Sequence, residues 1–155
     1  MRKLHTLALL VALLAASAFT TQPMDERTAQ NALPQSHDSL WAVFAKCKVT
    51  SNHQDFTYSI VRTAEVEALE GKELTIQGFM LPLEAKDKFT HYLLSKRTPT
   101  CGFCPPGEPN EVVEVFSDKP VAWEEGMVAV TGTMAFTDNA EKGLFFQLKN
   151  AKLAK

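Results

Sequence analysis

Apolar and polar residues alternate along three runs in the second half of the chain, and this pattern restricts the fold strongly. The runs cover residues 73–80, 128–136 and 144–148. A period of two places every other side chain on the same face of a β-strand. Shorter β-rich runs occur at 92–94 and 112–116, and Gly, Pro and Asn residues separate the runs as turns. The sequence therefore predicts at least five short strands.

Several short strands with little helix between them are typical of a small barrel or sandwich. Gly78 and Gly132 lie in the middle of predicted strands on the expected inner face, where glycine permits the sharp bend that a small closed barrel needs. Before the strands, Asp38 or Ser39 can cap a short helix with an apolar stripe over residues 40–44. We therefore predict a mostly β fold, a small barrel of the oligonucleotide/oligosaccharide-binding (OB) type with a short N-terminal helix.

The N-terminus has the three parts of a secretory signal. Two basic residues precede an apolar run over residues 7–16, and the small residues 16–18 form a cleavage site. The run is shorter than the roughly 20 residues that cross a bilayer, and no cysteine follows it to carry a lipid. We therefore expect a signal peptide over 1–18, cleavage after Ala18, a periplasmic location and no membrane insertion after cleavage.

The rest of the chain divides into a leader and one domain. Residues 19–36 are polar without hydrophobic periodicity and predict a flexible leader, and residues 37–155 predict a single β-rich domain. After removal of the signal peptide, 14 of the 16 basic residues remain against 18 acidic ones, a formal charge of −4. No basic stripe remains to neutralise phosphates, so we expect no nucleic-acid partner. Nucleophile elbows, phosphate loops and HExxH pairs are also absent from the sequence, and we expect no enzyme.

The CxxC segment from Cys101 to Cys104 is the part of the sequence best suited to chemistry, and it has three interpretations. Thiol–disulfide exchange is disfavoured, because the following Pro105-Pro106-Gly107 run cannot propagate the helix that activates such cysteines. A structural disulfide would rigidify the loop, since disulfides persist in exported proteins. Alternatively, the two thiolates can hold one zinc or copper(I) ion.

A metal site here would need further ligands, because structural zinc usually has four. His91 begins the strand that leads into the cysteine loop and is the nearest candidate in sequence, whereas His37 and His53 are more remote. Cys47, on the predicted early helix, is the third cysteine of the mature chain. It either packs as a small buried hydrophobe or pairs with a cysteine of the loop.

Five blocks follow one another in the domain. They are TIQGFMLPL (75–83), HYLLS (91–95), CGFCPPG (101–107), EVVEV (111–115) and GLFFQL (143–148). In this order they resemble the exported bacterial proteins grouped as domain-of-unknown-function family 3299. The resemblance implies a periplasmic or lipid-anchored location and a genomic setting beside transporter components linked to metal supply. Cys101 and Cys104 match the family's cysteine pair, and His91 falls where members tend to carry a histidine.

Two hypotheses follow. The first is a periplasmic accessory protein that binds a transition metal, zinc before copper, through Cys101, Cys104 and His91, and that serves a subunit of a metal-linked transporter. The second is a non-catalytic interaction domain whose two loop cysteines form a structural disulfide. The residues that would then dock a partner are Phe103, Pro105 and Pro106.

Overall fold

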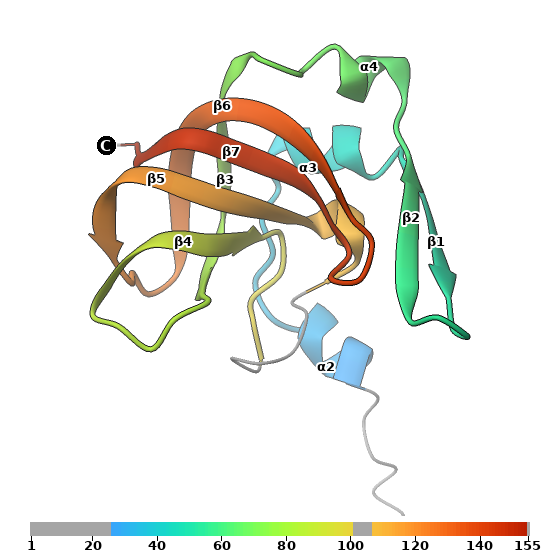
Figure 1. Ribbon diagram of the computed structural model, residues 1–155. Helices are drawn as coiled ribbons and strands as arrows, with labels where there is room; N and C mark the ends of the chain where they lie inside the picture. The colour runs from blue at the N-terminus through green and yellow to red at the C-terminus, as the bar shows by residue number, and fades with distance from the viewer. Residues whose placement is uncertain (1–25, 101–106, 155) are drawn as a thin grey trace, which may run out of the picture.

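The computed structural model describes residues 26–100 and 107–154, and this part of the chain is mostly β (Figure 1). Three short α-helices are present in it: α2 (Glu26–Asn31), α3 (Ser39–Phe44) and α4 (Ala64–Glu67). The strands are β1 (Lys48–Asn52), β2 (Thr57–Val61), β3 (Glu73–Pro82), β4 (Lys88–Ser95), β5 (Val112–Ala122), β6 (Met127–Asn139) and β7 (Leu144–Leu153). A 3₁₀ turn, η2 (Pro109–Glu111), precedes β5.

Five of these strands close into a barrel in the order β3-β4-β5-β7-β6. Neighbours are antiparallel except β5 and β7, which run parallel. This is the Greek-key arrangement of an OB barrel, so the predicted fold class is confirmed. The apolar side chains of the alternating runs point inward and fill the barrel interior. Its fully buried side chains include Ile76, Tyr92, Leu94, Val113, Val115, Val130, Met134, Phe146 and Leu148.

The two mid-strand glycines allow the strands to approach one another closely. A Cβ atom on Gly78 would lie 2.7 Å from the carbonyl oxygen of Ser95, and one on Gly132 would lie 3.0 Å from that of Lys149. Both contacts are with backbone atoms, which cannot turn aside as a side chain can. Close approach of a neighbouring backbone is therefore the reason the structure gives for glycine at these two positions, whereas the sequence predicted a sharp bend there.

Helix α3 packs its apolar side into the core. Asp38 caps the helix, because its carboxylate accepts a hydrogen bond from the N–H of Leu40 at 2.9 Å. Trp41 and Phe44 are buried, and the ring of Phe44 stacks on that of Phe146 with 4.5 Å between centroids. The helix ends at Phe44. Cys47, which the sequence placed on this helix, therefore follows it instead.

Part of the predicted leader has regular structure. The predicted signal peptide and the first residues of the predicted leader lie outside the described part of the chain, but residues 26–36 include helix α2 and a β-bridge at Gln35. The N–H of Ser36 donates to the carbonyl of Lys96 at 2.8 Å, and Gln35 forms a β-bridge with Arg97. The sequence predicted a flexible leader up to residue 36, and from Glu26 onward the structure gives this segment a helix and backbone contacts with the barrel. Backbone pairing with the barrel is present at Gln35 and Ser36, and a hydropathy pattern does not reveal such pairing.

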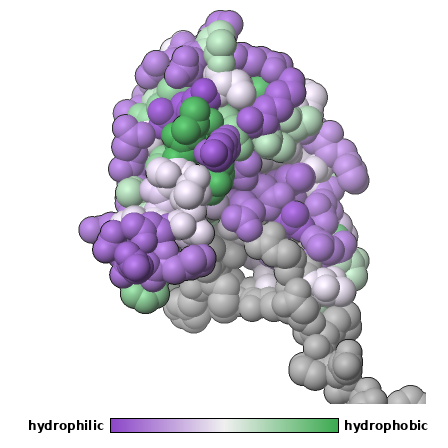
Figure 2. Space-filling view, turned by 90° about the vertical axis from the view of Figure 1, so that its right-hand side faces the viewer, coloured by the Kyte–Doolittle hydropathy of each residue, from purple (hydrophilic) through white to green (hydrophobic). Residues whose placement is uncertain are grey.

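Strands β1 and β2 form a hairpin beside the barrel, seen at the right of Figure 1, which the sequence did not predict. The side of the molecule on which the hairpin lies is mostly hydrophilic, with one compact hydrophobic area (Figure 2). At the hairpin turn, Phe56 is 83% exposed and has a φ of 52°, a left-handed conformation that is unusual for a bulky residue. Within the described residues, none of the helices has the length and apolarity to span a membrane.

Candidate functional site

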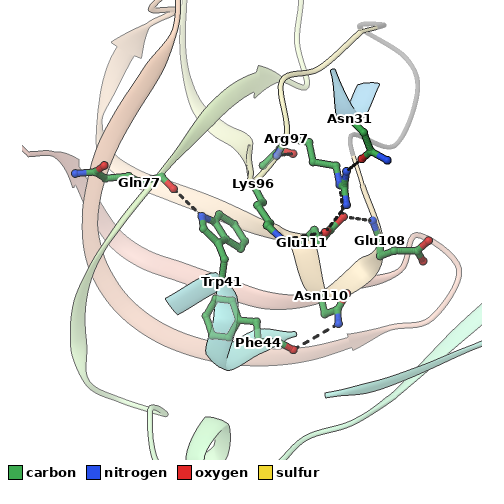
Figure 3. A network of polar contacts seen from close by, with 10 residues as sticks. Asn31, Trp41, Phe44, Gln77, Lys96, Arg97, Glu108, Asn110 and Glu111 are labelled. Carbon is green, nitrogen blue, oxygen red and sulfur yellow. Dashed lines mark hydrogen bonds and ion pairs between the residues drawn. The ribbon is translucent and has the colours of Figure 1, made fainter. Parts of the chain in front are cut away.

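An ion pair joins the two ends of the segment that contains the cysteines. Arg97, just after β4, donates from Nε and Nη2 to the two carboxylate oxygens of Glu111, at 2.6 and 2.9 Å. This two-pronged geometry is the strong form of an arginine–carboxylate contact. Lys96 adds a third donor, with its Nζ 3.3 Å from Glu111 Oε1. Figure 3 shows these side chains converging on Glu111.

The pair is largely shielded from water, since the side chains of Arg97 and Glu111 are 13% and 11% exposed. Burial acts to raise the pKa of Glu111, but the hydrogen bonds from Arg97 and from the Glu108 backbone, with the charges of Arg97 and Lys96, outweigh it. The pKa of Glu111 therefore lies below its ordinary value. The hydrogen bond to Glu111 likewise raises the pKa of Arg97. Both groups are charged at neutral pH, and they fix the positions at which the chain leaves and re-enters the barrel.

Contacts with the surrounding segments reinforce this ion pair. Arg97 Nη1 donates to the side-chain oxygen of Asn31 on α2, so the leader is tied to the same group. On the other side, Glu111 Oε2 accepts the N–H of Glu108 at 3.3 Å in a capping box. A Cβ atom on Gly107 would lie only 2.9 Å from Glu111 Oε2. Glycine is therefore the residue that fits where the chain returns from the cysteine segment.

The sequence-predicted loop residues Cys101, Phe103, Cys104, Pro105 and Pro106 lie outside the described part of the chain. Over residues 26–100 and 107–154, no three His, Cys, Asp or Glu side chains are grouped closely enough to hold a metal ion.

Cys47 is a free, buried thiol. Burial raises its pKa, and this effect outweighs the backbone N–H of Thr63 and the charge of Arg62, which act to lower it. A protonated, buried thiol is neither a good nucleophile nor a ready metal ligand. The structure therefore supports the prediction that Cys47 packs as a small hydrophobic residue.

His91 lies on the outer face of the barrel, in register with Phe116 of β5. The two rings stack with 4.5 Å between centroids and 9° between planes. Glu114 is 8% exposed, and both of its carboxylate oxygens are used. Oε1 accepts from Nε2 of His91 at 2.8 Å, and Oε2 accepts from the amide of Gln147 at 2.7 Å. A carboxylate only accepts hydrogen bonds, so the proton of neutral His91 is on Nε2 and its Nδ1 is left as an acceptor.

Beside this cluster, a groove is lined by residues of β5 and β7, and the strand pairing is irregular at two places nearby. Along β5 the register with β4 shifts between the pairs Phe89–Val121 and His91–Phe116. The β5–β7 pairing shifts as well, between Val115 and Ser117, where Asn150 of β7 adopts a φ of 52°. The groove is a shallow cavity of about 430 Å³. Its lining residues are Phe116, Ser117, Asp118, Gln147, Lys149 and Asn150.

Comparison with known proteins identifies the family. A family model described as "Protein of unknown function (DUF3299)" matches residues 15–150. The chain belongs to the DUF3299 family. Its fold is similar to that in the crystal structure of a DUF3299 family protein from Pseudomonas aeruginosa PAO1, with a TM-score of 0.52 and 19% sequence identity. The similarity covers 74% of this chain and 93% of the other. A search of curated proteins found no match.

Family membership confirms the resemblance that the sequence blocks indicated, and it assigns no activity to this DUF3299 protein. The functional arrangement comes from the structure itself. His91 was expected from its position in sequence, whereas Glu114 and Gln147 were not. Alternation along β5 could have placed Glu114 on the outer face beside His91, but the pairing with β7 depends on strand order.

Proposed function

We propose that this protein is a periplasmic accessory protein that binds one transition-metal ion through the thiolates of Cys101 and Cys104. Zinc is the expected ion, and copper(I) is the alternative, because both accept thiolate ligands. Two cysteines separated by two residues can bind the same ion. The export signal in the sequence supports the periplasmic location.

The observation that carries the proposal is the buried ion pair between Arg97 and Glu111. Because the pair ties together the two ends of the cysteine segment, the segment has fewer conformations than a loop with free ends. A restricted loop loses less conformational entropy when it closes on an ion, which strengthens binding. Both carboxylate oxygens of Glu111 accept hydrogen bonds from Arg97. We therefore assign the ion pair the role of positioning the cysteine segment and not that of a metal ligand.

His91 is the proposed third ligand, and Glu114 supports that role. Histidines that bind metals usually donate their other ring N–H to a carboxylate, which fixes the ring and its tautomer. The 2.8 Å contact between His91 Nε2 and Glu114 Oε1 has this form and leaves Nδ1 for the ion. His91 lies four residues before Ser95 along β4, roughly 13 Å at the rise of a strand. Gly107 is packed beside Glu111 and Arg97, and Cys104 precedes it by three residues, a reach of about 10 Å, so binding of His91 to the same ion requires the loop to fold back along β4.

Three protein ligands leave one position of a tetrahedral ion open. An open position lets a second protein donate a ligand before the first releases the metal, so such a shell suits transfer better than storage. We therefore propose a subunit of a metal-linked transporter as the recipient. The mature protein's formal charge of −4 also favours attraction of a cation.

Competition titrations with a zinc chelator test the proposal. The mature protein should bind one zinc per chain, and Cys101→Ser/Cys104→Ser should abolish binding, since removal of both thiolates leaves too few ligands. His91→Ala should weaken binding by at least about 10–100-fold. Loss of a residue that only supports a metal ligand already has an effect of that size, and His91 is proposed as a ligand itself. Cys47→Ser and His53→Ala are matched controls and should bind as the parent does. Unchanged affinity in the double cysteine variant would overturn the proposal, and unchanged affinity in His91→Ala alone would remove only the third ligand.

A further inference from the structure

The groove between β5 and β7 is a second candidate binding site, distinct from the cysteine segment. Each of its two walls carries a break in strand register, and irregularities of this kind commonly re-aim side chains beside functional sites. Its volume of about 430 Å³ lies in the range of roughly 300–1,000 Å³ that small-molecule sites occupy.

The base of the groove is held in place by contacts already described. The ring of His91 covers one face of Phe116, which orients the aromatic wall. The amide nitrogen of Gln147 is held by the buried carboxylate of Glu114. The carbonyl oxygen of the same amide is therefore fixed as an acceptor. These two lining side chains are positioned before any ligand arrives, which lowers the entropic cost of binding.

The polar lining contains donors and acceptors in a mixed set. Asp118 only accepts hydrogen bonds and Lys149 only donates them, whereas the Asn150 amide does both. The Ser117 hydroxyl donates to Oη of Tyr92 at 3.5 Å, so it is left as an acceptor for a ligand. Neither charged side chain has a side-chain partner among the described residues. Asp118 disfavours an anion, and Lys149 disfavours a cation. A hydroxyl group donates and accepts at once, so a neutral ligand with several hydroxyls matches the lining, and Phe116 offers an apolar surface to the C–H face of a sugar ring.

We propose that this groove binds a short neutral saccharide. The site is open to solvent, so we expect weak binding with a Kd of about 1 mM. The groove shares only His91, through its stacking on Phe116, with the proposed metal site, and the titration is carried out with and without a chelator so that metal binding and saccharide binding are read separately. Failure of one proposal is therefore distinguishable from failure of the other.

The test is a titration of the ¹⁵N-labelled mature protein with maltose, cellobiose and N,N′-diacetylchitobiose, each followed by amide chemical shifts. We expect saturable shifts at Ser117, Asn150 and the side-chain amide of Gln147 with at least one of the three. Asp118→Ala should weaken that binding about tenfold, the effect of losing a hydrogen bond to a charged group. Lys152→Ala, on the same strand as Lys149 and also exposed, should leave it unchanged.

Three results would overturn the proposal. One is the absence of shifts at the groove up to about 50 mM of every probe, well above the expected Kd. Another is an Asp118→Ala variant that keeps the spectrum of a folded protein and binds as tightly as the parent. The third is binding that weakens strongly with added salt, because screening acts on charged ligands and not on neutral ones.

Discussion

Replacement of Glu111 by alanine should lower the free energy of unfolding by about 3 kcal/mol at neutral pH. Removal of one partner from a buried ion pair typically costs about 3–5 kcal/mol, because the other charge is left without compensation. Here Arg97 keeps 13% of its side chain exposed, so some water can reach it, and the lower end of the range applies. The variant also removes the acceptors for Lys96 and for the N–H of Glu108.

The cost should depend on pH in a defined direction. The pKa of Glu111 is lower in the folded protein than in the unfolded chain. Its contribution to stability is therefore fully present above the unfolded pKa of about 4.3, and it is lost as the pH falls through the folded pKa. The difference between the parent and Glu111→Ala should thus be largest near pH 7 and should shrink below about pH 4.

Urea unfolding followed by circular dichroism at pH 7 and at pH 3 measures the loss of unfolding free energy and its dependence on pH. In a thermal scan, a loss of about 3 kcal/mol corresponds to a fall in Tm of roughly 10 °C. The matched control is Glu65→Ala. Glu65 also pairs with a lysine, Lys46, at 2.6 Å, but those side chains are 52% and 56% exposed, so the loss should stay below about 1 kcal/mol. A Glu111→Ala cost no larger than that of the control, or equal at the two pH values, would refute the reasoning.

Three further predictions concern single residues. Gly78→Ala should destabilise the barrel by about 2–3 kcal/mol in urea unfolding, because its Cβ would meet a backbone oxygen at 2.7 Å; an effect below about 1 kcal/mol would contradict that packing. Phe56→Asn should stabilise the protein by about 0.5 kcal/mol in the same assay, since asparagine tolerates the observed φ of 52° better, and destabilisation would count against it. The Cys47 thiol should react with a thiol reagent only after unfolding, because burial raises its pKa and hides it; rapid reaction of the native protein at this position would show otherwise.

The barrel could be predicted because its information is local. Alternation over residues 73–80, 128–136 and 144–148 reports directly which side chains face inward, and the two inner glycines mark where strands crowd. The segment 118–120 has the composition of a turn but does not separate two strands. Its Asp, Lys and Pro are typical turn residues, yet they lie within β5, where a register shift accommodates them.

The site was predicted only in part, because its contacts join residues far apart in the chain. Glu111 meets Arg97 across the cysteine segment, and Asn31 reaches the same arginine from the leader. Nothing in the composition of residues 26–36 indicates that this segment packs against the domain. Likewise, the pairing of Glu114 with Gln147 requires β7 to lie beside β5, an order that follows from barrel closure and not from any single motif.

The most direct test of the proposed function is native mass spectrometry of the mature protein, purified from the periplasm without a metal-affinity tag. Intact mass and bound ions are read in the same spectrum. The proposal predicts a protein with fully reduced cysteines that carries one zinc or copper ion per chain. A mass two hydrogens below the reduced value, with no ion bound, would mean that Cys101 and Cys104 form a disulfide and would contradict the metal-binding account.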